Sequence, residues 1–454
     1  MEETKKEKFN RYDLTQGSVV KKMIVFALPL VLTYILQAVF GLCDMAIVGH
    51  FLGAPGMSAV NIAGLITNVL VAIAGGLSNG GNVYIGQLFG AKKKDEIPKI
   101  VGSMLTFMII VSIVLVAITM IFAKPMLIAL DTPDEAFNDA VIYLLWVAGG
   151  EIFLFAYNAL AASLRAVGDS FLPTIAICVG IVTNIGLDYL FVGPLHMGVA
   201  GAAIATVVCE ALTAVLAFIF AVKHGILKLK IADYKLNGKY IKVVLKIGFP
   251  LALQFALNVG SYVLISIFVN QYGVDASAAS GAVSKIGSFA ILPAQALQAT
   301  MLTLTAQNIA VKNYSRIKKS LVVALVISVC FSGLFWLAAH FVPEGMLGIF
   351  TTDKAVLEIG ARFFQIMTIS YIFESILFSF LGIVSGSGYT IFAFCVGLFS
   401  AYIIRFPLVI IFNKFTQMGF NGIAWAYVFA PLAASIGAFI FYLTGKWKKS
   451  KIKI

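Results

Sequence analysis

Long apolar runs alternate with short polar segments along the whole chain, and this alternation predicts membrane-spanning helices. Each run is as long as the roughly 20 residues that an α-helix needs to cross a hydrocarbon layer of ~30 Å. The chain is therefore predicted to be an all-α membrane protein with twelve transmembrane helices. They are expected at residues 23–50, 57–86, 100–122, 138–162, 171–192, 199–222, 243–270, 277–309, 320–342, 356–384, 391–413 and 420–444.

Composition and charge agree with this pattern. Of the 454 residues, 60% are hydrophobic and only 12% are charged, which excludes an ordinary soluble domain. The net charge of +12 does not indicate a nucleic-acid partner, because the basic residues lie in short loops and tails where anionic lipid headgroups attract them. On the predicted topology, 27 of the 33 Lys and Arg residues fall on one side, so we expect both termini in the cytoplasm and the protein in the cell membrane.

The chain also repeats itself at an offset of about 220 residues. The segment ALPLVLTYILQ from Ala27 resembles GFPLALQFALN from Gly248, and GQLFGAKK from Gly86 resembles AQNIAVKN from Ala306. An offset of six helices predicts two six-helix bundles related by a parallel pseudo-twofold repeat, the architecture expected for alternating access. The expected divisions are an N-terminal cytoplasmic tail, an N-terminal lobe, a cytoplasmic linker, a C-terminal lobe and a basic cytoplasmic tail, at residues 1–22, 23–223, 224–242, 243–445 and 446–454.

One carboxylate stands out in the first apolar run. Asp44 is the only acidic residue between Met23 and His50, and an isolated charge at that depth costs at least ~2.5 kcal/mol. Thr33 and Gln37 share its helix face. This face is therefore predicted to point toward protein or a water-filled cavity rather than toward lipid.

Three further polar residues are predicted at the same depth as Asp44. Counting from the helix ends at 1.5 Å per residue puts Asp44, Asn184, Asp188 and Thr206 within about 6–12 Å of the outer boundary. Two carboxylates, an amide and a hydroxyl are hard oxygen ligands, suited to a hard cation or to a shared proton, and protons should compete with the cation. We favour an ion or proton site; the alternative is a buried hydrogen-bond network that holds three helices together.

Several motifs in this order resemble the multidrug and toxic compound extrusion (MATE) transporters of bacteria. The motifs are LTQGS from Leu14, LPLVLTYILQ from Leu28, D-x-x-x-V-G-x-x-x-G from Asp44, GQLFGA from Gly86, LRAVGDS from Leu164 and G-x-x-G-A-A from Gly198. The resemblance implies a secondary antiporter that exports organic, often cationic, compounds in exchange for Na⁺ or H⁺. It also implies that Asp44, Asn184, Asp188 and Thr206 match the family's Na⁺ site. We expect no tightly bound cofactor and a monomer.

The two halves are predicted to differ in their polar residues. The repeat places Ile265 opposite Asp44, so the coupling chemistry should belong mainly to the first half. Candidate cavity residues are Tyr34, Gln37, Gln254 and Asn258. Glu374 and Arg405 are expected at mid-membrane on adjacent helices, where a structural ion pair is favoured over a direct role in substrate binding or coupling.

Three other functions fit parts of the pattern. A lipid-linked oligosaccharide flippase of related fold is the main alternative, but such carriers often have extra helices and a basic cavity. An intramembrane enzyme is not expected, because no serine has an apparent partner and the four His lie near helix ends. A facilitator-type sugar or drug carrier shares the six-plus-six repeat, and the set Asp44, Asn184 and Asp188 argues against it.

Overall fold

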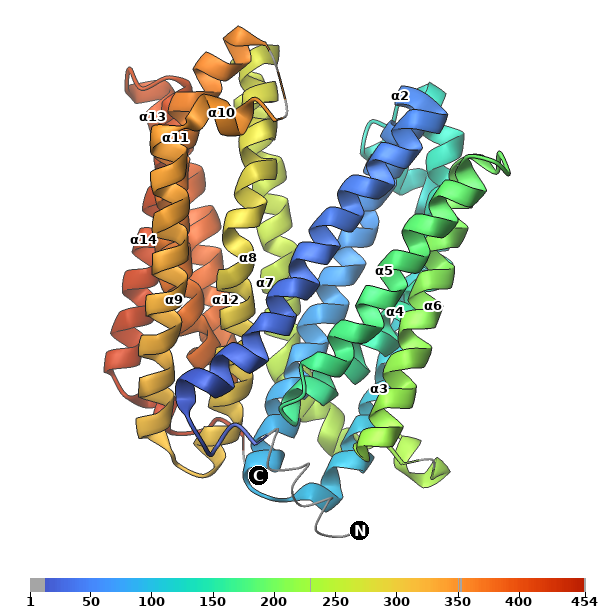
Figure 1. Ribbon diagram of the computed structural model, residues 1–454, viewed down its shortest axis with the longest axis vertical. Coiled ribbons are helices and arrows are strands. Elements are labelled where there is room, and N and C mark those ends of the chain that lie inside the picture. Colours follow the sequence, from blue (N-terminus) through green and yellow to red (C-terminus); the bar gives the residue numbers. More distant parts are fainter. Residues whose placement is uncertain (1–12, 229, 350, 352, 453–454) are drawn as a thin grey trace. The chain divides into compact units, whose positions relative to one another are not determined.

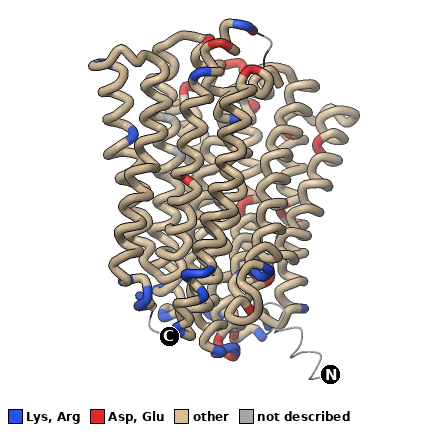
Figure 2. The backbone as a smooth tube through the Cα atoms, turned by 60° about the vertical axis from the view of Figure 1, so that its left-hand side comes forward, with Lys and Arg blue, Asp and Glu red and all other residues tan. Residues whose placement is uncertain are grey.

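The computed structural model describes residues 13–228, 230–349, 351 and 353–452, and nearly all of them are helical (Figure 1). Contacts between residues divide the chain into two compact units. The first contains Leu32–Ala252, and the second contains Leu14–Val31 and Leu253–Ile454. Figure 2 shows the Lys and Arg positions mainly at the ends of the helices, with few along their middle, as expected for helices that cross a lipid layer.

The first unit is a helical bundle in which α4 packs against α3 and α6, and α5 packs against α6. A cluster of buried apolar side chains, including Val60, Leu127, Leu144 and Val199, fills the space between these helices. The helices that contribute to this unit are α2 (Val19–Gly90), α3 (Ile97–Ala129), α4 (Asp134–Ala166), α5 (Phe171–Val192), α6 (Gly198–His224) and α7 (Gly238–Asn270), with the short helices η1 (Lys94–Glu96) and η2 (Ile231–Tyr234).

The second unit is a bundle around α11, which packs against α8, α9 and α14. Its buried core includes Ile265, Phe363, Phe364 and Ile423. Besides parts of α2 and α7, it contains α8 (Val274–Ala310), α9 (Tyr314–Phe341), α10 (Pro343–Leu347), α11 (Lys354–Gly386), α12 (Thr390–Leu398), η3 (Phe399–Arg405), α13 (Phe406–Phe415), α14 (Phe420–Leu443) and η4 (Lys446–Lys448).

The number of membrane crossings agrees with the sequence prediction. Within the described residues, eleven helices are long and apolar enough to span a membrane. One of them, α2, has 72 residues and would be about 108 Å long if straight, far more than one crossing needs. Its helical geometry is broken at Gly53, whose φ of 66° and ψ of −160° favour glycine, so α2 contains two spans. The predicted loop at residues 51–56 is thus replaced by a single non-helical residue.

Two helices are divided between the units. The boundaries fall between Val31 and Leu32 in α2 and between Ala252 and Leu253 in α7. Each boundary lies two residues after a proline, Pro29 or Pro250, and the repeat pairs these prolines.

The predicted divisions follow membrane crossings rather than contacts, so the lobes 23–223 and 243–445 stay a prediction. Residues 1–12 of the predicted tail, residue 229 of the linker and residues 453–454 of the basic tail lie outside the described residues.

Glycines allow α7 to lie very close to the second span of α2 within the first unit. A Cβ atom on Gly76 would stand 2.2 Å from the backbone nitrogen and Cα of Ala252. A Cβ atom on Gly80 would stand 2.4 Å from the carbonyl oxygen of Val244. Small residues at such contacts let helix backbones approach, which is how helices commonly associate in lipid.

We therefore expect Gly76→Ala to destabilise the protein by about 1–3 kcal/mol, because the added methyl group must push two backbones apart. Gly64→Ala on the same helix is the matched control, since its Cβ would meet no atom within 4 Å. Thermal unfolding of the detergent-purified variants measures the difference. Equal midpoints for the two variants would contradict the close approach at Gly76.

Candidate cation site

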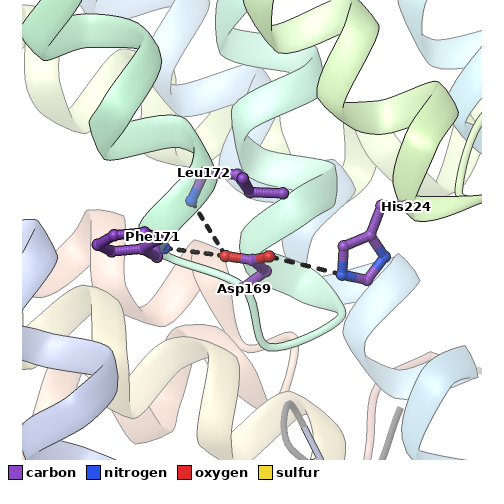
Figure 3. A network of polar contacts seen from close by, with 4 residues as sticks. All are labelled: Asp169, Phe171, Leu172 and His224. Carbon is purple, nitrogen blue, oxygen red and sulfur yellow. Dashed lines mark hydrogen bonds and ion pairs between the residues drawn. The ribbon is translucent and has the colours of Figure 1, made fainter. Parts of the chain in front are cut away.

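The helix that presents two of the candidate ligands begins at a fixed polar turn. The Oδ1 atom of Asp169 accepts hydrogen bonds from the backbone N–H groups of Phe171 (2.9 Å) and Leu172 (3.1 Å) at the start of α5. Its Oδ2 atom lies 3.5 Å from Nε2 of His224 at the end of α6 (Figure 3). Gly168, with φ of 97°, lets the chain turn out of α4 just before. The LRAVGDS motif thus sets the start of α5 and ties it to α6.

Further along α5, two side chains face α6. Asn184 is 2% exposed and Asp188 is fully buried. The amide orientation that satisfies both groups has the Asn184 nitrogen donating to Oδ2 of Asp188 (2.7 Å) and its oxygen accepting from the backbone N–H of Thr206 (3.3 Å). The Thr206 hydroxyl donates to the carbonyl of Ala202 (3.1 Å), which leaves its oxygen lone pairs available. The structure therefore joins Asn184, Asp188 and Thr206, as the depth argument predicted.

Asp44 completes this group from α2. Its carboxyl group lies within hydrogen-bonding range of the carboxyl group of Asp188. The Oδ1 atom of each residue is buried and has no hydrogen-bond partner. Two carboxyl groups at this distance repel each other when both are charged, so a proton or a cation is needed between them. The four residues thus converge as the sequence predicted; their role as ligands stays a prediction.

The structure adds residues that the sequence reasoning did not assign to the site. Tyr143 on α4 is 7% exposed, and its hydroxyl group interacts with Thr206 and electrostatically with both aspartates. Counting along α4 from its outer end would have placed it at the same depth as Asp44. One turn beyond Thr206, Glu210 interacts electrostatically with Glu151 of α4, and each has a buried Oε2 atom without a hydrogen-bond partner.

The remaining candidates in the first half of the chain lie outside this group. Thr33 is buried and hydrogen-bonds to Thr174 of α5 (2.8 Å). Gln37 is exposed, whereas Tyr34 is half-buried and interacts electrostatically with Arg165. The structure therefore does not bring Tyr34 or Gln37 into contact with the carboxyl pair, and their cavity role stays a prediction.

The candidates in the second half lie in the second unit. Gln254 is 9% exposed, and its side chain packs on Gly397 of α12, where a Cβ atom would stand 3.0 Å from its Cγ. Asn258, one turn further on, is half-buried. Both stay candidates for a cavity wall.

Glu374 and Arg405 do not form the structural ion pair that the sequence reasoning favoured. They interact electrostatically, but within the described part of the chain no direct ion pair joins them. Instead, the guanidinium carbon of Arg405 lies 4.7 Å from the ring centre of Tyr427 and 5.4 Å from that of Tyr262. The guanidinium thus lies beside a stacked pair of tyrosine rings, which stabilise its charge by cation–π interaction.

The chemistry of the first-unit site suits a small hard cation or a proton. Its oxygen atoms come from two carboxyl groups, an amide and a hydroxyl, the ligand type that alkali and alkaline-earth cations prefer. The described residues contain no group of three or more His, Cys, Asp or Glu side chains that could hold a metal ion.

Comparisons with known proteins agree with the fold and the repeat. The family model "MatE" matches residues 29–190 and again residues 250–411, the same offset as the internal repeat. Two Bacillus subtilis (strain 168) proteins are similar over nearly their whole length. "Probable multidrug resistance protein YpnP" is 27% identical (97% of this chain, 98% of the relative), and "Probable multidrug resistance protein YoeA" is 28% identical (99% of each).

A solved structure has the same fold. It is described as the "Outward-facing conformation of a multidrug resistance MATE family transporter of the MOP superfamily". It matches with a TM-score of 0.90 at 18% identity and covers 96% of this chain and 97% of that chain. The predicted twelve-helix, two-repeat architecture is thereby confirmed.

We expect Asp169→Ala to destabilise the protein by about 0.5–2 kcal/mol, because the first backbone N–H groups of α5 lose their acceptor. Asp169→Asn keeps an acceptor oxygen and should cost less. Thermal unfolding in detergent gives the ranking. An alanine variant as stable as wild type would show that the turn does not fix the start of α5.

Proposed function

This chain belongs to the MatE family, and we propose that it is a secondary antiporter that exports organic compounds, often cationic, in exchange for Na⁺ or H⁺. Family membership makes it a multi-pass membrane protein that transports small molecules, and its relatives are multidrug resistance proteins. These relatives favour neither the lipid-linked oligosaccharide flippase nor an intramembrane enzyme. What we propose beyond family membership is that transport is coupled to Na⁺ or H⁺ and follows an antiport cycle.

The main support for this proposal is the carboxyl pair of Asp44, which is half-buried, and Asp188, which is fully buried. Each has an Oδ1 atom that is buried and without a hydrogen-bond partner. Leaving such oxygens unsatisfied in an apolar, membrane-spanning bundle is costly, and a bound cation or proton removes that cost. A purely structural network would be expected to satisfy these atoms with protein donors. The site thus favours binding and release of an ion.

The mechanism we propose is competition between ion and drug. Na⁺ or H⁺ that enters from outside binds among Asp44, Asn184, Asp188 and Thr206 and shifts α2, and the hold on the drug weakens. Because α2 contributes to both units, a shift at Asp44 can be transmitted along one continuous chain segment. Coupling of this kind requires that the ion bind one conformation more tightly than the other.

The setting we propose is the cell membrane, with both termini in the cytoplasm and the protein acting as a monomer. No tightly bound cofactor and no nucleic acid take part. The basic loops and tails then face anionic lipid headgroups on the cytoplasmic side.

Transport of ethidium tests the proposal. We expect wild-type protein in proteoliposomes to move ethidium when either a Na⁺ gradient or a pH gradient is imposed, and the effective gradient identifies the ion. In Asp44→Asn and Asp188→Asn the gradient-driven rate should fall at least about tenfold, because a neutral amide cannot hold and release the ion.

The matched control is Glu135→Gln, an exposed carboxylate at the start of α4. It should transport at the wild-type rate. Gradient-driven transport that persists in Asp44→Asn would remove this carboxylate from the coupling mechanism. A folded wild-type protein that moves no organic cation under either gradient would contradict the antiporter itself.

A further inference from the structure

A second polar cluster lies in the second unit, around Arg405. This residue ends the segment η3 in the middle of the apolar span Thr390–Phe415 and is only 5% exposed. Tyr262 comes from α7 and Tyr427 from α14, and their rings stack 6.0 Å apart at an angle of 22°. The guanidinium lies over both rings, so three helical elements meet at one positive charge.

The charge of Arg405 is not neutralised by a direct partner. The acidic residue that interacts with it, Glu374 on α11, forms no ion pair with it among the described residues. Its Nε atom is buried and has no hydrogen-bond partner. Cation–π contacts contribute about 0.5–2 kcal/mol each, so the two tyrosines offset part of the ~2.5 kcal/mol or more that a charge costs at the centre of a bilayer. The Nε–H donor of Arg405 stays without an acceptor.

The backbone at Arg405 is also unusual. Phe399–Arg405 is π-helical, and the N–H group of Phe406 bonds to the carbonyl of Ala401, five residues earlier. Pro407 follows directly, and its ring and missing N–H prevent a regular α-helical turn there. Such π-helical insertions are rare and occur frequently at functional sites. Here the insertion sets the direction in which Arg405 leaves its helix.

From these observations we propose that Arg405 binds an anionic group of the transported compound: a carboxylate, sulfonate or phosphate attached to an otherwise apolar, aromatic body. Such a group would place a negative charge in direct contact with the guanidinium and accept the unsatisfied N–H, since guanidinium binds carboxylate and phosphate oxygens through two parallel hydrogen bonds. The flat tyrosine faces suit an aromatic body beside it.

A ligand can reach the guanidinium from the side of Tyr262. This ring is 49% exposed, whereas Tyr427 is 8% exposed and forms part of the buried core. A rotation of the Tyr262 side chain would open this side of the guanidinium, although it would break the stacking of Tyr262 on Tyr427. Tyr262 is thus the exposed ring of the pair and Tyr427 the buried one.

This inference rests on the proposed export of organic compounds and narrows their class. The first unit offers carboxyl groups to a coupling cation, and the second offers a guanidinium to an anion on the substrate. Compounds with both an aromatic body and an anionic group, including zwitterions, would be bound more tightly than the same compounds with the anion capped.

Two dyes that differ at one group test this directly. Rhodamine B carries a free carboxylate, which is capped in rhodamine B ethyl ester. Fluorescence anisotropy of each dye with detergent-purified protein measures binding without any need for transport. We expect wild type to bind the acid at least about tenfold more tightly than the ester, the value of one charge-assisted hydrogen bond. Arg405→Gln should remove this preference by weakening binding of the acid, with the ester affinity unchanged within about twofold.

Arg362→Gln is the matched control, since Arg362 is an exposed arginine of α11. It should keep the wild-type preference. Equal loss of both dyes in Arg405→Gln would show a structural role and overturn the proposal.

The wild-type measurement remains decisive where the glutamine variant does not fold. Binding of the ester as tightly as the acid would overturn the proposal. Because this assay needs no ion gradient, its failure is distinct from failure of gradient-driven ethidium transport.

Discussion

The close approach of Asp44 and Asp188 is the constraint on which the first unit depends. Burying two carboxyl groups in an apolar bundle is tolerable only if their positions are fixed and their charge can be compensated. The structure meets the first condition with a hydrogen bond from Asn184 to Asp188 and with a polar turn at Asp169 that fixes the start of α5. It leaves the second condition to a cation or proton, since one oxygen of each carboxyl group has no protein donor.

The internal repeat gives the chain two similar bundles with different chemistry. Ile265, which the repeat places opposite Asp44, is 1% exposed and packs in the apolar core of the second unit. That unit instead contains a buried guanidinium beside a stacked pair of tyrosines. The two halves thus share a helical repeat while their polar residues differ. In the proposed mechanism the first unit binds the coupling ion, and the second binds an anionic group of the substrate.

Hydropathy and helix geometry were enough to predict the helices, their repeat and the residues of the candidate cation site. The number of spans, the repeat and the meeting of Asp44, Asn184, Asp188 and Thr206 follow from run lengths and from depth at 1.5 Å per residue. The break at Gly53 was not predicted. The hydropathy pattern shows that two spans are separated, but it does not show whether a loop or a single residue separates them.

The surroundings of Arg405 could not be predicted for a different reason. Tyr262, Arg405 and Tyr427 are far apart in sequence, and the π-helical segment before Pro407 changes the direction of the arginine. Helical periodicity assumes a regular turn and therefore fails there. Pairing by opposite charge favoured Glu374 as the partner, whereas the direct contacts of the guanidinium are with the rings of Tyr262 and Tyr427.

Reciprocal coupling is the most direct test of the central claim that the carboxyl pair links ion and drug. In proteoliposomes without any ion gradient, an outward ethidium gradient should drive uptake of radioactive sodium or of protons in the opposite direction, because coupling between two sites acts both ways. We expect this uptake in wild type and its loss in Asp188→Asn. Ethidium efflux that moves neither cation, or cation uptake that persists in Asp188→Asn, would contradict the account.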